Sequence, residues 1–303
     1  MVAVSGGADS LALLLSLAAL ARRSHRRYQL IVGHVNHHLR PEADREAEAV
    51  RRAAEVLGLE CEVRDVHPRG AAGNLAAAAR TMRYESLAGI MRSVSAGALV
   101  TAHHGTDQLE TVLMALLRGA GPEGLAGLAW RSRRWGIDII RPMLERTHAE
   151  CIDLCRRCGW TWAEDPSNLD VSKRRNAIRA RLLPLLLDLA PDLDRRVHRT
   201  TDLLREAAGL IEREVDRAFP DAAAGEFDRG ALAAAGELII GAGLRRAGAT
   251  LGSPLDELTH EVVRPAVDAI MDTAVRRPRR FHWPGGITVV VRARVVAISR
   301  DDG

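Results

Sequence analysis

The segment Ser5-Gly-Gly-Ala-Asp-Ser10 lies between an apolar run, Val2-Ala3-Val4, and a long apolar stretch, Leu11 to Leu20. A strand that turns through two glycines into a helix leaves unpaired backbone N–H groups at the positive end of the helix dipole, which together form an anion site. A Walker A loop is excluded because it needs a lysine, and Lys173 is the only lysine. We therefore expect a pyrophosphate site, with Asp9 recruiting Mg²⁺. The expected contacts are Ser5, Gly6, Gly7, Ala8, Asp9 and Ser10.

A second motif helps to distinguish a phosphate site from an ordinary strand-to-helix turn capped by Asp9 or Ser10. The stretch Thr101-Ala-His-His-Gly-Thr-Asp-Gln-Leu-Glu-Thr111 follows an apolar run and begins another helix. Asp107 and Glu110, spaced i and i+3, share one face of that helix. In a parallel sheet this loop opens on the same edge as the glycine segment. Carboxylates beside a phosphate chain bind metal, take a proton or hold a cationic substrate.

Apolar strands and long helices alternate along the first half of the chain in the βαβ manner. This pattern predicts an α/β fold with a doubly wound parallel sheet, whose ligands bind at the carboxyl ends of the strands. Both motifs lie at such ends. The expected strands are 2–5, 29–35, 60–66, 98–103 and 137–141, and the expected helices between them are 9–22, 42–58, 74–93 and 107–118.

Beyond residue 145 the alternation stops, and the pattern predicts a second, mainly helical unit that ends in a strand. Two units are expected because 303 residues exceed the usual size of one core. We place the first at residues 1–145 and the second at residues 146–303, with the best break inside the second at Phe219-Pro-Asp-Ala-Ala-Ala-Gly225. The expected elements of the second unit are helices at 147–158, 178–189 and 191–217 and a strand from Ile287 to Ser299.

The composition agrees with a helix-rich α/β protein, because 47% of the residues are hydrophobic and only 3% are aromatic. The net charge of +4 favours a polyanionic partner. The sequence contains no recognisable signal peptide and no apolar run of transmembrane length. We therefore expect a cytoplasmic protein without membrane contacts.

Four cysteines bear on whether the chain holds a metal cluster. Cys151 and Cys155 are spaced i and i+4 on the apolar face of a predicted helix, with Cys158 just beyond them. No second pair lies nearby in the sequence to complete four ligands. Core packing is therefore the expected role of these thiols.

A basic cluster, Lys173-Arg174-Arg175 with Arg179 beyond it, follows Trp162. Arginines near an aromatic side chain suit a single-stranded RNA loop with splayed bases, while the alternative is a solvated helix start. The paired residues His103 and His104 end a buried strand, and we assign a catalytic role to neither.

The glycine segment resembles the SGGxDS loop of the N-type ATP pyrophosphatases, the PP-loop superfamily that includes amidotransferase synthetases, tRNA thiolases and lysidine synthetases. Further motifs resemble the tRNA(Ile)-lysidine synthetases in order and spacing, densely over residues 1–190. They are His34-Val-Asn-His-His-Leu-Arg40, Ala79-Arg80-x-x-Arg83-Tyr84, His103-His104-x-x-Asp107-Gln108-x-Glu110-Thr111, Leu117-Arg-Gly-Ala-Gly121, Gly124-Leu-Ala-Gly-Leu128, Arg141-Pro142, Trp162-x-x-Asp165-Pro-Ser-Asn168 and Arg175-Asn-Ala-Ile-Arg179.

The resemblance implies an adenine nucleotide α-hydrolase-like fold and a two-step ligation that uses ATP and Mg²⁺. The wobble cytidine of an isoleucine tRNA with a CAU anticodon is adenylated as pyrophosphate leaves, and free L-lysine then displaces AMP to form lysidine. Asp9 is the implied Mg²⁺ ligand, and Asp107 and Glu110 orient the lysine or remove its proton. Arg80 and Arg175 stabilise phosphate charge. The implied tRNA contacts are Arg174, Arg175 and Arg179.

The chain departs from the family pattern at Thr106, where a second aspartate is usual, and at Ala76, where a glutamate is frequent. A missing carboxylate weakens metal or lysine binding, so a degenerate paralogue that binds tRNA without chemistry is one alternative. A PP-loop tRNA thiolase is another, and it would need a catalytic cysteine, for which Cys61 is the only candidate outside the predicted helix. A small-molecule amidotransferase-type synthetase would not need the module from Trp162 to Arg179. Whether the protein forms a homodimer is left open.

Overall fold

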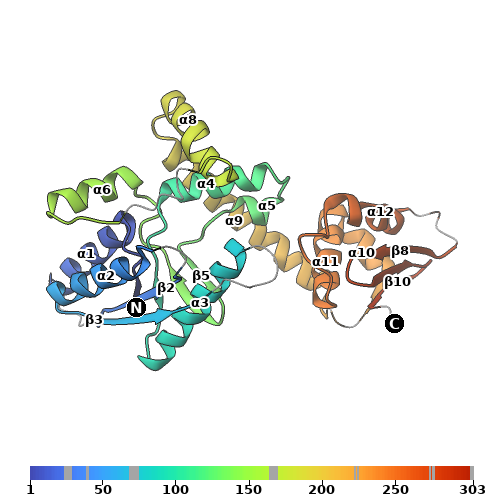
Figure 1. Ribbon diagram of the computed structural model, residues 1–303. Helices are drawn as coiled ribbons and strands as arrows, with labels where there is room; N and C mark the ends of the chain where they lie inside the picture. The colour runs from blue at the N-terminus through green and yellow to red at the C-terminus, as the bar shows by residue number, and fades with distance from the viewer. Residues whose placement is uncertain are drawn as a thin grey trace. The chain divides into compact units, whose positions relative to one another are not determined.

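The computed structural model describes residues 1–23, 29–38, 41–67, 75–163, 170–221, 223, 225–272, 274 and 277–300. The chain forms two compact units, Met1–Leu204 and Arg205–Gly303 (Figure 1). The first unit thus extends past residue 145, where the sequence pattern placed the boundary. The reason is that the helices beyond that residue pack back onto the α/β layer, for instance α6 (His148–Arg157) onto α1 (Ala8–Arg23).

The first unit is built on a six-stranded sheet with strand order β3-β2-β1-β4-β6-β5. All neighbouring strands are parallel except β5, which runs antiparallel to β6 at the edge. The predicted doubly wound parallel sheet is confirmed. The strand β5 was not predicted, because its sequence Arg-Ser-Arg-Arg has no apolar alternation. The bounds are β1 Val2–Ala3, β2 Ile31–Asn36, β3 Glu60–Asp65, β4 Leu99–Val100, β5 Arg131–Arg134 and β6 Ile137–Ile140.

Helices cover both faces of this sheet. One core cluster joins β1 and β2 to α1, α2 (Ala43–Leu57) and α6, and a second joins the opposite face to α3 (Leu75–Ser93). Helix α2 forms because Ala43, Ala47, Val50 and Ala54 recur on one buried face, and it ends at Gly58, whose φ of 68° is left-handed. The remaining bounds are α4 Gly105–Leu116, α5 Pro122–Leu125, α7 Arg174–Ala177, the π-helix η2 Ile178–Leu182, α8 Leu183–Leu189 and α9 Leu193–Ala218.

The second unit combines helices with an antiparallel sheet of strand order β7-β10-β9-β8. The single strand predicted from Ile287 to Ser299 was wrong, because it is a hairpin: Arg292 to Arg294 separate two strands whose apolar residues face one core. No described helix has the length and apolar character needed to cross a membrane. The bounds are β7 Glu226–Asp228, α10 Arg229–Ala235, α11 Glu237–Thr250, α12 His260–Met271, β8 Arg279–Trp283, β9 Ile287–Val291 and β10 Val295–Arg300.

Candidate active site

The glycine segment joins the carboxyl end of β1 to the first turn of α1. Gly6 has a φ of 88°, a left-handed conformation that favours glycine. Its carbonyl accepts a hydrogen bond from the Ala163 N–H (3.0 Å), and the Gly7 carbonyl accepts one from the Leu11 N–H (3.1 Å). The first N–H groups of α1 have no partner within the helix, so the turn presents donors at the positive end of the helix dipole.

Two serines connect the ends of the glycine segment. The Ser5 N–H donates to Ser10 Oγ (3.1 Å), and the two hydroxyl oxygens lie 3.2 Å apart. The Ser10 hydroxyl in turn donates to the Gly7 carbonyl (2.9 Å). These bonds fix the shape of the turn without using a charged side chain.

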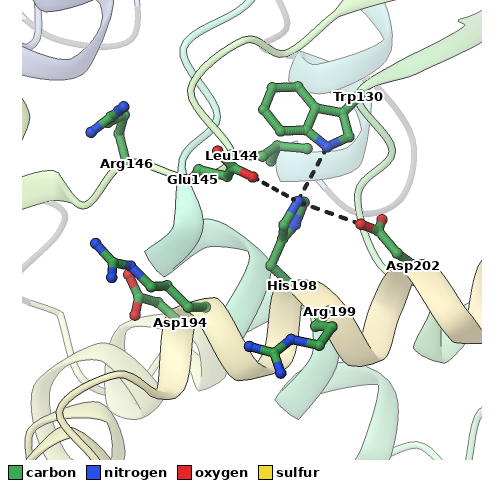
Figure 2. A pocket seen from close by; sticks show the side chains of 9 residues that line it. Trp130, Leu144, Glu145, Arg146, Asp194, His198, Arg199 and Asp202 are labelled. Atoms are coloured by element: carbon green, nitrogen blue, oxygen red, sulfur yellow. Dashed lines mark hydrogen bonds and ion pairs between the residues drawn. The ribbon is translucent and has the colours of Figure 1, made fainter.

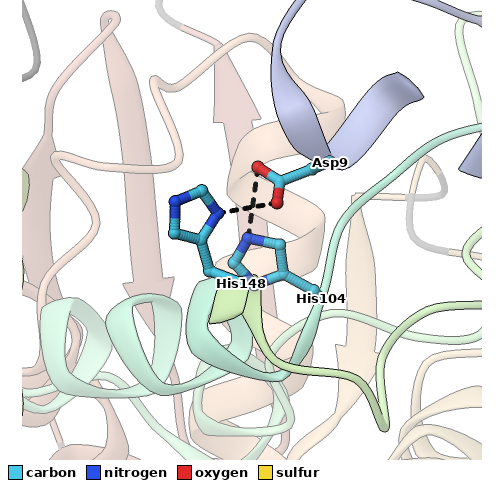
Figure 3. A group of neighbouring side chains, drawn as sticks. All are labelled: Asp9, His104 and His148. Atoms are coloured by element: carbon cyan, nitrogen blue, oxygen red, sulfur yellow. Dashed lines mark hydrogen bonds and ion pairs between the residues drawn. The ribbon is translucent and has the colours of Figure 1, made fainter. Parts of the chain in front are cut away.

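Asp9 faces two histidines from distant parts of the chain (Figure 3). His148 Nδ1 lies 2.7 Å from Asp9 Oδ1, and His104 Nε2 lies 3.5 Å from Asp9 Oδ2. Burial alone would raise the pKa of Asp9, but the hydrogen bonds and charges of His104 and His148 outweigh it and hold that pKa well below its usual range. The hydrogen bond with Asp9 likewise raises the pKa of His148. Asp9 is therefore an anion at neutral pH.

The sequence predicted that Asp9 binds Mg²⁺. In the described part of the chain, the one group with metal-ligand geometry is Asp9, His104 and His148, which offers a single carboxylate and two imidazoles. Mg²⁺ takes oxygen ligands and is usually held by one or two carboxylates together with substrate phosphates. Of these three side chains only Asp9 offers the oxygen ligand that Mg²⁺ prefers. The group therefore fits Mg²⁺ only when the phosphate oxygens of a bound nucleotide supply further ligands.

Asp107 and Glu110 lie in the first turns of α4, which follows β4 at the same sheet edge as the glycine segment. Glu110 is completely buried and lies between two guanidinium groups, with Arg175 Nε at 2.5 Å and Arg179 Nε at 2.6 Å. Arg175 also donates to Asp107 Oδ1 (2.9 Å). Burial lowers the pKa of Arg175, but its bonds to Glu110 and Asp107 raise it on balance. We call these four residues the acid–arginine cluster.

This cluster changes the expectation for the basic segment. Arg175 and Arg179, predicted to contact tRNA, balance the two carboxylates, whereas Arg174 is exposed on α7. The π-helix η2 follows directly, and such turns are frequent at functional sites. The sequence did not anticipate this pairing. Residues 164–169, which include Asp165-Pro-Ser-Asn168 of the predicted motif, and Arg40 of an earlier motif lie outside the described part.

Three further arginines lie near His103, which is close to Asp107. Burial lowers the pKa of His103 to about 3, so the ring is neutral, and the nearby charges are Asp107 and three arginines. Burial also lowers the pKa of Arg80, whose guanidinium lies 5.5 Å from the Tyr84 ring centroid and interacts with the charge of Arg175. The predicted phosphate-stabilising residues Arg80 and Arg175 thus lie in one region. The three arginines are Arg80, Arg83 and Arg141.

Cys151 and Cys155 belong to the core, as predicted, whereas Cys158 at the end of α6 is exposed. Cys151 and Cys155 are buried between α6 and α1, and the Cys155 thiol donates to the Ala8 carbonyl (3.4 Å). Burial raises the pKa of Cys155 to about 11 and also raises that of Cys151. Neither thiol is therefore a thiolate at neutral pH, as a nucleophilic sulfur must be.

A separate pocket of about 490 Å³ lies along the start of α9 (Figure 2). Trp130 Nε1 donates to His198 Nε2 (3.2 Å), and that nitrogen lies 3.6 Å from Asp202 and 3.8 Å from Glu145. None of the lining residues belongs to the glycine segment or the acid–arginine cluster. The lining is Trp130, Leu144, Glu145, Arg146, Asp194, Arg195, His198, Arg199 and Asp202.

Comparisons with known proteins agree with this fold. The family model of the PP-loop domain matches residues 1–186. A solved structure described as the U34-tRNA thiolase NcsA from Methanococcus maripaludis, with its [4Fe-4S] cluster, superposes with a TM-score of 0.58 at 17% identity, covering 67% of this chain and 70% of that one. At that identity the likeness establishes the fold alone.

Several relatives of this chain are tRNA(Ile)-lysidine synthases, which narrows the family within the PP-loop proteins. The tRNA(Ile)-lysidine synthase of Salinispora tropica is 36% identical over 309 residues, covering 99% of this chain and 90% of its own length. That of Alkalilimnicola ehrlichii is 42% identical over 217 residues, covering 69% of this chain and 46% of its own. That of Symbiobacterium thermophilum is 36% identical, covering all of this chain and 60% of its own. The chain belongs to the tRNA(Ile)-lysidine synthase family, although it spans only about half to two thirds of several relatives.

Proposed function

We propose that the protein ligates free L-lysine to carbon 2 of the wobble cytidine of an isoleucine tRNA with a CAU anticodon, using ATP. The observation that carries the proposal is the similarity to the Salinispora tropica enzyme over 99% of this chain. The neighbouring anion turn and carboxylates at one sheet edge support it, because the reaction needs both. We place the reaction in the cytoplasm, where tRNA, ATP and lysine occur together.

In the first step, the carbonyl oxygen on carbon 2 of the cytidine attacks the α-phosphate of ATP and pyrophosphate leaves. The N–H groups of the glycine segment bind the leaving pyrophosphate, while Ser5 and Ser10 keep the turn in shape. We assign to Arg80, which interacts with the charge of Arg175, the stabilisation of the phosphate charge that develops. Mg²⁺, when bound with ATP, neutralises phosphate oxygens, and Asp9 is the side chain that would hold it.

In the second step, the ε-amino group of lysine attacks carbon 2 and AMP leaves. Glu110 already has two guanidinium partners, so an incoming ammonium must replace one of them. The phosphate of the adenylated tRNA is a competing partner for a displaced arginine, because guanidinium pairs equally well with phosphate. Asp107, with 14% of its side chain exposed, is the carboxylate that remains reachable for the proton the ammonium must lose.

The alternatives make different demands on the chain. A thiolase needs a reactive sulfur, for which Cys61 was the candidate. Burial raises the pKa of the Cys61 thiol, as it does for Cys151 and Cys155, which argues against a thiolate at any of the three. A degenerate tRNA-binding paralogue remains the rival because Thr106 replaces a usual aspartate. An active ligase forms adenylated tRNA, whereas an inactive paralogue binds tRNA without forming it.

The test is incubation of the protein with isoleucine tRNA transcript, ATP and labelled lysine. We expect label in the tRNA only when ATP is present and position 34 is cytidine, with a transcript carrying uridine there as the matched control. Incorporation of sulfur from a donor instead of lysine would replace the proposal with the thiolase. Binding of tRNA without adenylation would replace it with the inactive paralogue.

A further inference from the structure

Three helix starts bring one carboxylate and two imidazoles together beside the glycine segment (Figure 3). Asp9 lies in the first turn of α1, His104 is the N-cap of α4, and His148 is the first residue of α6. Their ligand atoms all lie within 4.8 Å of one another. Ligands around an ion with bonds of about 2.1 Å are separated by about 3 to 3.5 Å, so small side-chain rotations close the site.

The donor atoms indicate which ion fits. Two imidazole nitrogens and one carboxylate oxygen form the set that binds Zn²⁺, Fe²⁺ or Co²⁺, whereas Mg²⁺ prefers oxygen throughout. We propose that Asp9, His104 and His148 form a binding site for a divalent first-row transition metal in the protein without nucleotide. This inference goes beyond the ligase function, because the site requires neither ATP nor tRNA.

Exposure of the three side chains matches a metal site with an open position. The His104 side chain is 2% exposed, while those of Asp9 and His148 are 31% and 50% exposed. A buried imidazole fixes one side, and the open side leaves room for water or a phosphate oxygen. Three protein ligands with a free position are typical of catalytic rather than structural zinc sites.

Binding the metal has a local cost. His104 Nδ1 accepts a hydrogen bond from the Asp107 N–H (3.4 Å), so the ring carries its proton on Nε2, toward Asp9. A metal at Nε2 moves that proton to Nδ1 and removes the cap of α4. Loss of the His104 cap weakens metal binding by about fivefold, and this cost is small beside the gain from three metal–ligand bonds. At His148, the metal replaces the proton now shared with Asp9.

The test is titration of the chelator-treated full chain with Co²⁺, whose visible absorption changes when nitrogen ligands bind. We expect one saturable Co²⁺ per chain, displaced by Zn²⁺ and not by an equal concentration of Mg²⁺. His148→Ala should weaken Co²⁺ binding by about 100-fold, because His148 is half-exposed and its loss removes a ligand without disturbing the core. His148→Asp should restore binding but shift preference toward Mn²⁺, which accepts oxygen.

His198→Ala is the matched control, since His198 Nε2 also lies near two carboxylates but in the separate pocket. It should bind Co²⁺ as the unaltered chain does. The proposal is overturned if the unaltered chain takes up no saturable Co²⁺, or if His148→Ala and His198→Ala bind it equally. In that case the histidines serve only as hydrogen-bonding partners of Asp9. The assay contains no lysine or tRNA, so its failure leaves the proposed ligase untouched, and failure of lysine transfer leaves the metal site untouched.

Discussion

The glycine segment and the acid–arginine cluster lie at the same edge of the sheet but differ in their polar groups. The first presents backbone N–H donors, and the second pairs charged side chains. The glycine segment offers backbone N–H groups whose direction is set by one left-handed residue, Gly6. The acid–arginine cluster instead balances two carboxylates with two guanidinium groups brought from α7 and η2. A site made of backbone groups tolerates most side-chain changes. A buried cluster of charges destabilises the protein when one partner is removed, because the remaining charge is then uncompensated. Variants of the two regions should therefore affect different properties.

The largest effect on stability is expected from removing both arginines of the acid–arginine cluster. Arg175→Ala with Arg179→Ala leaves Glu110 buried without a counter-charge, which should lower the free energy of unfolding by about 3 to 5 kcal/mol. Adding Glu110→Gln to that pair should restore part of the loss, because no buried charge then remains. Urea unfolding of the double and triple variants measures this difference. A triple variant less stable than the double would mean that Glu110 is not held by charge pairing.

Asp9→Asn should have the largest effect on activity, and the fold should survive because asparagine is also well tolerated at a helix start. The substitution keeps the size of the side chain but removes the negative charge that pairs with His148 and that we propose holds Mg²⁺. Adenylation of tRNA should fall by two or more orders of magnitude, about 3 kcal/mol of transition-state stabilisation. Single-turnover formation of adenylated tRNA is the measurement. Near-normal adenylation would remove Asp9 from the first step.

A smaller, paired effect distinguishes backbone geometry from general strain. Gly6→Ala and Gly58→Ala both place an L-residue at a left-handed φ, 88° and 68°, and each should cost about 1 to 2 kcal/mol of stability. Neither new Cβ meets a close neighbour, the nearest to Gly6 being Glu46 Cβ at 3.7 Å. Only Gly6→Ala should weaken ATP binding. If Gly58→Ala weakened it equally, loss of stability rather than shape of the turn would be the cause.

The smallest effect is expected at the exposed end of the basic segment. Arg174→Ala should leave the unfolding free energy unchanged and reduce the salt dependence of tRNA binding by about one counterion. Arg175→Ala should also destabilise the protein, because it removes a partner of Glu110. Fluorescence anisotropy at several salt concentrations tests the distinction. An unchanged salt slope for Arg174→Ala would identify that side chain as a solvated surface residue.

The sequence predicted the elements that depend on local pattern, but not the contacts between residues far apart in the chain. The alternation of apolar strands and helices is enough for the parallel sheet, and two adjacent glycines before a helix are enough for the strand-to-helix turn at its edge. The contacts of Glu110 with Arg175, 65 residues away, and of Asp9 with His148, 139 residues away, depend on how α6 and α7 pack. No spacing rule in the sequence marks such pairs.

Ligation through adenylated tRNA has two steps, and a chase experiment follows both of them in order. The protein is incubated with isoleucine tRNA and α-labelled ATP without lysine, and the RNA is then followed after unlabelled lysine is added. We expect labelled AMP to accumulate on the tRNA first and to be released when lysine is added, as lysidine appears at position 34. Release of AMP without any lysine in the tRNA, or no adenylated tRNA at all, would contradict it.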